Sequence, residues 1–182
     1  MRWRARTIVH LHSARRASRP QLKRDPLGGT PVYRMVWEFA YEFMELSCSR
    51  KDGSVRVFDV RTEGVADPEG EVWFFYARPK EYAGKQEYFA SFKKVAPGVL
   101  QVEGLKNGLP ETYRGYCITC ALIPQVAAKH QARVQSSRSL ANGELRTDAA
   151  TRAWKRMERE GTATYDPDED RFHHPPLSDR AA

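Results

Sequence analysis

Alternating apolar and polar positions run through the first half of the chain and predict β-strands. Between residues 37 and 43, aromatic side chains alternate with glutamate and alanine, and this period of two indicates a strand. The KDGS sequence at 51–54 is typical of a tight hairpin, because Asp-Gly tolerates the positive φ angles of such turns. Residues 54–63 would then form the returning strand of that hairpin.

Two more strands are predicted before the pattern changes. Residues 71–79 contain a continuous aromatic run, which indicates a strand buried on both faces. Residues 98–107 form the fourth strand, which ends at Asn107-Gly108 and Pro110. The polar residues 79–97 between them fit either a short helix at 85–94 or a loop.

After residue 110 apolar positions recur at helical spacing. The sequence predicts a helix over 118–130, a short strand at 132–137, a second helix over 148–160 and a last strand at 162–166. Thr147 suits the N-cap of the second helix, and Gly161 suits its C-terminal end. The predicted fold class is therefore α+β, an antiparallel N-terminal meander followed by β-α-β-α-β. Its β-α-β unit at 98–137 would pair two parallel strands, with an anion site at the N-terminus of the crossover helix.

Charge separates a basic arm from the rest of the chain. Residues 1–30 hold eight basic side chains and one acid, whereas the remaining residues are neutral overall, although the chain carries +7. The arm could be disordered, bind nucleic acid through phosphates, or act as an organelle presequence. We expect a disordered arm at 1–30, one domain at 31–172 and a disordered tail at 173–182. No run of 18 apolar residues suggests a membrane span, and a cytoplasmic location is expected.

The run VLQVEGLKNGLPETYRGYCITCALIPQVAAKH at 99–130 resembles the core of the GNAT N-acetyltransferase superfamily. In that family a strand leads through a turn with the pattern Q/R-x-x-G-x-G/A into an apolar helix. The resemblance covers about residues 97–172 and implies a GNAT-like mixed sheet. It also implies an acyl-CoA-dependent N-acyltransferase that passes the acetyl group of acetyl-CoA to an amine. The implied cofactor-binding residues are Leu105, Arg114, Gly115, Tyr116, Cys117, Ile118 and Thr119, with backbone amides of 114–119 on the pyrophosphate.

The motif departs from the family pattern in either register. With Arg114 in the Q/R position, the glycine positions fall on Cys117 and Thr119; a shift of two keeps Gly115 and places Cys117 last. Each register loses a glycine that would admit phosphate close to the backbone. Pro124 further predicts that the helix begins late or is kinked.

The resemblance also implies catalytic positions. Glu103 on the fourth strand matches the general base, although a solvent-facing glutamate is the alternative. Trp154 occupies the position of the tyrosine that often serves as general acid, and Tyr165 or Tyr116 could substitute. Ser136 and Ser137 follow the fifth strand, either in the substrate cleft or in a plain loop.

The cysteine pair at 117 and 120 suggests three other chemistries. A zinc site would need further ligands, a redox pair would suit a helix N-terminus, and small apolar cysteines would pack helix against sheet. We expect the apolar role, no metal and, with an odd total of three cysteines, no disulfide framework. The alternative function is a degenerate binding protein that no longer catalyses and contacts nucleic acid through the arm.

Overall fold

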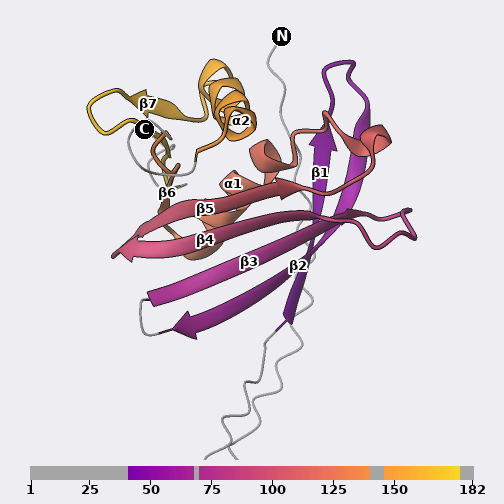
Figure 1. Ribbon diagram of the computed structural model, residues 1–182, viewed down its shortest axis with the longest axis horizontal. Coiled ribbons are helices and arrows are strands. Elements are labelled where there is room, and N and C mark those ends of the chain that lie inside the picture. Colours follow the sequence, from indigo (N-terminus) through magenta and orange to yellow (C-terminus); the bar gives the residue numbers. More distant parts are fainter. Residues whose placement is uncertain (1–40, 68–69, 140–145, 177–182) are drawn as a thin grey trace, which may run out of the picture.

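The computed structural model describes residues 41–67, 70–139 and 146–176, and it consists mostly of one β-sheet with two α-helices (Figure 1). The expected arm at 1–30 and residues 31–40 lie outside the described residues. The elements in chain order are β1 (Tyr41–Ser49), β2 (Val55–Asp67), β3 (Gly70–Pro79), β4 (Tyr88–Ala96), β5 (Val99–Asn107), η1 (Glu111–Tyr113), α1 (Ile118–His130), β6 (Arg133–Gln135), α2 (Asp148–Arg159), β7 (Thr164–Asp166) and β8 (Arg171–His174).

The sheet has eight strands in the order β1-β2-β3-β4-β5-β6-β8-β7. All neighbouring pairs are antiparallel except β5 and β6, which are parallel and joined by α1. The predicted fold class was therefore wrong. The protein is dominated by an eight-stranded mixed sheet with a hairpin at its far end, rather than a GNAT-like α+β layout of β-α-β-α-β.

The first hairpin forms where the Asp-Gly signal predicted it. Gly53 has a φ of +84°, and Asp52 Oδ1 accepts hydrogen bonds from the backbone N–H and the hydroxyl of Ser54, at 2.9 and 2.6 Å. These local bonds fix the register in which Ser49 lies opposite Val55. The turn thus aligns the nine paired positions of β1 and β2.

Strand β4 occupies part of the segment for which a helix or loop was expected, and that expectation was wrong. Tyr88, Ala90 and Phe92 alternate toward the core, with exposed fractions of 4% or less. Phe89 faces the other side and packs between Phe74 and Tyr76 of β3. The charged end of β4 hides this alternation in the sequence, whereas pairing with β3 and β5 enforces it.

Helix α1 covers the face of the sheet that carries the largest buried side chains. Leu122, Ile123 and Val126 are fully buried there, in the same cluster as Phe75 and Phe92. Burying apolar area of this kind is the dominant favourable term in folding. Helix α1 therefore packs on one face of the sheet as it connects β5 to β6.

Pro124 lies inside α1, which nevertheless begins at Ile118. Proline has no N–H, so the carbonyl of Cys120 lacks its i+4 helical donor.

Helix α2 starts as predicted: the Thr147 hydroxyl accepts a hydrogen bond from the N–H of Ala150 at 3.2 Å, and Gly161 has a φ of +69° beyond its end.

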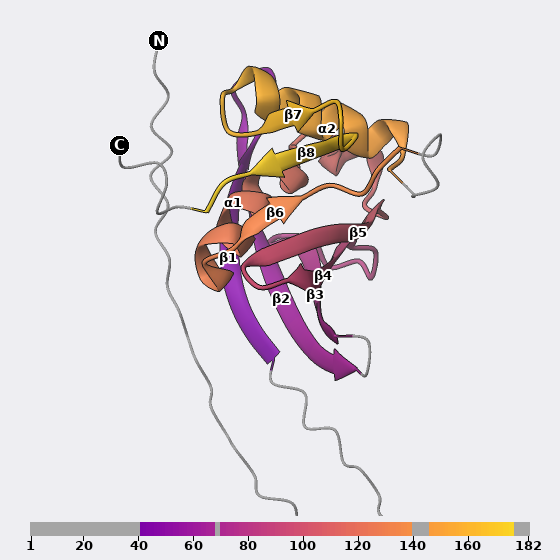
Figure 2. The same cartoon turned by 90° about the vertical axis from the view of Figure 1, so that its left-hand side faces the viewer.

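The last hairpin places β8 between β6 and β7, as Figure 2 shows. His173 pairs with Gln135 and His174 with Val134, and His174 is fully buried. The expected disordered tail from residue 173 was therefore wrong for these two histidines.

Among the described residues, no helix combines the length and apolar character needed to cross a membrane.

Candidate functional site: a cleft between two parallel strands

The parallel pairing of β5 and β6 is short. It joins only Val99–Arg133, Leu100–Val134 and Gln101–Gln135, in agreement with the expected β-α-β unit at 98–137. Strand β5 continues to Asn107, but β6 ends at Gln135. The edge of β5 beyond Gln101 thus loses its strand partner.

A bulge interrupts β5 at this same point. Val102 lies opposite Phe92 and Gly104 lies opposite Ser91, so Glu103 is an extra residue on β5. Bulges re-aim side chains and occur often beside functional sites. Glu103 is exposed at the place where the two strands separate.

A pocket lies at the C-terminal ends of these strands, where sheets containing parallel strands commonly bind ligands. Its walls come from the open part of β5, the residues after β6 and the first half of α2. Its volume of about 30 Å³ holds roughly one water molecule, so any larger ligand requires these walls to move apart. The lining residues are Val102, Glu103, Leu105, Ser136, Ser137, Arg146, Thr147, Ala150 and Trp154.

Four of the predicted site residues thus lie together in one pocket: Glu103, Leu105, Ser136 and Ser137. The Ser137 hydroxyl donates to the carbonyl of Val102 at 2.5 Å and bridges the two strands beyond their last pair. The Ser136 hydroxyl donates to the Ser137 carbonyl and accepts from the N–H of Phe172, at 2.8 and 3.0 Å. Both serines are therefore structural parts of the pocket wall.

Arg146 lines the pocket and was not anticipated from the sequence. Its guanidinium pairs with Asp170 Oδ1 at 2.5 Å and donates to the carbonyls of Ser137 and Asp170, at 3.0 and 2.7 Å. Both side chains of the ion pair are almost completely buried. Within the described chain the Nε–H of Arg146 is buried without a partner. A single arginine at this point of the sequence gives no signal for such a role.

The predicted phosphate turn lies at the start of α1. Gly115 has a φ of +88° and Cys117, the N-cap of α1, a φ of +40°. Arg50 from the first hairpin donates to the carbonyls of Thr112 and Arg114, at 2.9 and 2.7 Å, and holds the turn. Its guanidinium also lies over the Tyr116 ring, 4.6 Å from the ring centre.

The side chains of this turn do not converge on the pocket. Tyr116 is 5% exposed and packs edge-on against Phe58. Thr119 is buried, and its hydroxyl shares a hydrogen bond of 2.8 Å with Tyr88. The remaining predicted members, Arg114 and Ile118, also lie outside the pocket lining. The groups of this turn that remain for binding a ligand are the backbone N–H groups in the first turn of α1.

Helix α2 connects the turn and the pocket. Cys120 Sγ lies 3.8 Å from the carbonyl oxygen of Ala153, and the neighbouring Ala150 and Trp154 line the pocket. Trp154 is 1% exposed and stacks on Phe172. The turn and the pocket are thus two parts of one region at the end of β5.

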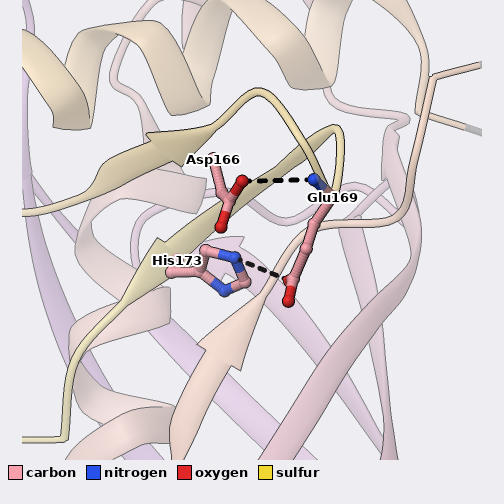
Figure 3. A group of neighbouring side chains, drawn as sticks. All are labelled: Asp166, Glu169 and His173. Atoms are coloured by element: carbon pink, nitrogen blue, oxygen red, sulfur yellow. Dashed lines mark hydrogen bonds and ion pairs between the residues drawn. The ribbon is translucent and has the colours of Figure 1, made fainter.

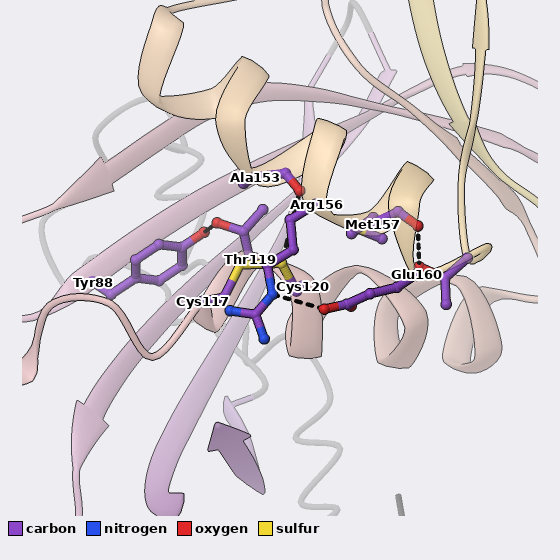
Figure 4. Close-up of a disulfide and its surroundings, with 9 residues drawn as sticks. Tyr88, Cys117, Thr119, Cys120, Ala153, Arg156, Met157 and Glu160 are labelled. Atoms are coloured by element: carbon purple, nitrogen blue, oxygen red, sulfur yellow. Dashed lines mark hydrogen bonds and ion pairs between the residues drawn. A yellow bond between two sulfur atoms is a disulfide. The ribbon is translucent and has the colours of Figure 1, made fainter. Parts of the chain in front are cut away.

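Cys117 and Cys120 form a disulfide at the start of α1, beside α2 (Figure 4). The expectation that they are separate apolar side chains was wrong. Cys48 is a free cysteine and buried, and burial raises the pKa of its thiol to about 12. The C-x-x-C spacing in the sequence indicated that Cys117 and Cys120 form a pair. The residue types alone do not decide whether their two sulfur atoms are bonded.

A group with metal-ligand chemistry lies in the last hairpin (Figure 3): Asp166, Glu169 and His173 bring one ligand atom each within 4.8 Å of one another. Asp166 Oδ1 accepts the N–H groups of Asp168 and Glu169, at 2.9 and 3.1 Å. His173 Nε2 lies 3.2 Å from the Glu169 carboxylate, and burial lowers the pKa of His173. These contacts close the hairpin, and the group lies outside the pocket lining.

Comparison of the chain with protein-family models, curated proteins and solved structures found no match.

Proposed function

We propose that the cleft between β5 and β6 binds the pantetheine arm of an acyl-CoA and transfers its acyl group to an amine. The observation that carries this proposal is the loss of pairing beyond Gln101, with the bulged Glu103 at the point of separation. Beyond the Val102 carbonyl, which accepts from the Ser137 hydroxyl, the open strand edge presents N–H and C=O groups that pair with an extended, amide-bearing ligand. The pantetheine arm is such a ligand, and the resemblance of residues 99–130 to acyltransferases supports this choice.

The chain supplies a distinct group for each part of the ligand. Leu105 on the pocket wall contacts the apolar stretch of the arm. The first-turn N–H groups of α1 and the turn at 114–119 hold the pyrophosphate, since the positive end of a helix dipole favours anions. The acceptor enters where Glu103 is exposed, and its ammonium is drawn to that carboxylate.

In the reaction Glu103 takes a proton from the amine, directly or through a water molecule. The neutral amine attacks the thioester carbonyl, its nitrogen loses a second proton to solvent, and the tetrahedral intermediate collapses to the amide and expels the CoA thiolate. Neither Tyr116 nor Tyr165 lines the pocket, and the indole of Trp154 has no acidic proton of use. The thiolate therefore takes its proton from solvent. We place this reaction in the cytoplasm.

A titration of the full chain with acetyl-CoA, followed by calorimetry, tests binding. Absence of binding at millimolar acetyl-CoA would overturn the proposal. Transfer of a radiolabelled acetyl group to a panel of primary amines tests catalysis. Glu103→Gln should reduce turnover by about 10²–10⁴-fold with little change in acetyl-CoA affinity, as for loss of a general base. Glu158→Gln, on the exposed surface of α2, is the matched control and should leave both unchanged.

The second candidate is a protein that binds acyl-CoA without turning it over. It is favoured by Trp154, which is buried and stacked where a tyrosine acid would be expected. Binding of acetyl-CoA with no transfer to any amine would select this candidate. Nucleic-acid binding through residues 1–30 would show as a salt-sensitive gel shift of the full chain, weakened by Arg15→Gln with Arg16→Gln.

A further inference from the structure

The disulfide between Cys117 and Cys120 occupies the first turn of α1 (Figure 4). Both cysteines are partly exposed, whereas Cys48, the free cysteine in the described chain, is buried. The Cys117–Cys120 disulfide is therefore the cysteine group that the described chain exposes to solvent.

The start of α1 favours a thiolate at this pair. The first N–H groups of a helix have no intrahelical acceptor and form the positive end of the helix dipole. Cys117 is the N-cap and makes no side-chain capping bond, and no acidic residue lies in the first turn. Cysteines in such positions ionise more readily than ordinary thiols, which stabilises the reduced form of the pair.

The rest of the fold does not depend on this bond. Cys117 and Cys120 are three positions apart, and a bond that closes so short a loop constrains the unfolded chain least. Arg50 independently holds the carbonyls of Thr112 and Arg114, and the Tyr88–Thr119 hydrogen bond anchors the first turn of α1. These hydrogen bonds thus still hold the turn when the disulfide is reduced.

Pro124 also separates the first turn from the remainder of α1. Because Pro124 lacks an N–H, the Cys120 carbonyl has no i+4 bond to hold it to the next turn. Val126 and Ala127 beyond Pro124 are buried in the core. The turn that carries the cysteines is therefore joined to the rest of α1 by one backbone hydrogen bond fewer than in a regular helix.

We propose that Cys117 and Cys120 are a redox-active pair that exchanges with external thiols, small thiols or protein dithiols. An external thiolate attacks Cys117 Sγ, because Cys120 Sγ packs against α2 near the Ala153 carbonyl. The S–S bond breaks, a mixed disulfide forms at Cys117, and the electron pair leaves with Cys120 as a thiolate. A second external thiolate attacks the external sulfur and expels the Cys117 thiolate. Two external thiols are thereby oxidised to a disulfide and the protein pair is reduced.

This exchange is separate from the proposed acyl transfer and uses no acyl-CoA. The full chain, without denaturant, is treated with millimolar dithiothreitol, quenched with acid, alkylated and analysed by mass spectrometry. We expect Cys117 and Cys120 to gain labels together, Cys48 to remain unlabelled and the circular dichroism spectrum to be retained. A disulfide that is reduced only after denaturant is added would overturn the proposal.

The rate of alkylation of the reduced protein gives the second test. At pH 6.5, Cys117 should react at least about ten-fold faster than the same cysteine in a free 112–130 peptide, because the folded helix stabilises its thiolate. Equal rates in protein and peptide would overturn the proposal.

Single variants assign the roles of the two sulfurs. With oxidised glutathione, Cys120→Ser should accumulate a mixed disulfide at Cys117, since no resolving thiol remains. Cys117→Ser is the matched control and should react at least about ten-fold more slowly, because the remaining sulfur lies against α2. If the two variants react at the same rate, the assignment of Cys117 as the attacked sulfur is wrong.

Discussion

The hydroxyl groups of Tyr88 and Thr119 share a buried hydrogen bond of 2.8 Å, which joins β4 to the first turn of α1. Tyr88→Phe keeps the ring but leaves the Thr119 hydroxyl without this partner. We expect the free energy of unfolding to fall by about 1–2 kcal/mol, measured by urea denaturation. Tyr113→Phe is the control, since its ring packs on Tyr82 and Arg56, and equal losses for both variants would contradict the prediction.

The ion pair between Arg146 and Asp170 lies almost entirely out of solvent, with side chains 5% and 11% exposed. Asp170→Leu should destabilise the protein by about 3–5 kcal/mol, because a buried guanidinium is left unpaired. The pair of Arg56 with Glu81 is similarly short, at 2.6 Å, but its side chains are 32% and 52% exposed. Glu81→Leu should therefore change the unfolding free energy by only about 0–1 kcal/mol. Similar changes in the unfolding free energy for Asp170→Leu and Glu81→Leu would show that burial does not decide how much these ion pairs stabilise the protein.

Alkaline pH should weaken the fold through two buried acids. Burial raises the pKa of Cys48 from 9.0 to about 12 and raises the pKa of Tyr88 above its usual value of 10.0. In the unfolded chain both groups lose their protons at lower pH, so the unfolding free energy falls as pH rises above about 9. Urea denaturation from pH 8 to pH 11 measures this slope. Cys48→Ala should make it shallower, and an unchanged slope would exclude Cys48 as a cause.

Acid should weaken the fold through His130 at the end of α1, whose ring centre lies 4.4 Å from that of Trp73. Burial lowers the pKa of His130 below 6.5, so the unfolded state binds a proton first. Stability present above about pH 6.5 is then lost as pH falls. Denaturation at pH 7.5, 6.5 and 5.5 should show the loss, reduced in His130→Gln. Trp73 fluorescence should report a protonation midpoint below 6.5, and a midpoint at or above 6.5 would contradict the assignment.

Local signals predicted the elements that depend on a few neighbouring residues. Asp52 and Gly53 specify the first hairpin through their own turn bonds, and Thr147 caps α2 through the N–H of Ala150. Glu103, Ser136 and Ser137, which flank the crossover helix in sequence, also line one pocket in the structure. Such features need no knowledge of distant strands.

Features that depend on distant partners could not be read from the sequence. Strand β4 forms because β3 and β5 lie on either side of it. The role of Arg146 depends on Asp170, which the last hairpin brings beside it, and the role of Arg50 depends on a turn 62 and 64 positions away. In each case the long-range contact, rather than the local residue types, decides the structure.

The position of β8 between β6 and β7 makes the cleft a product of late folding. The Phe172 N–H bonds to Ser136, and Arg171 donates to the Ser136 carbonyl at 2.7 Å. During synthesis from the N-terminus, the wall built on β6 therefore lacks the hydrogen bonds from Arg171 and Phe172 until residues 171–174 have left the ribosome. A nascent chain interrupted before that point would carry β1 to β5 without a completed cleft. The protein thus completes this pocket only as nearly the whole described chain becomes available.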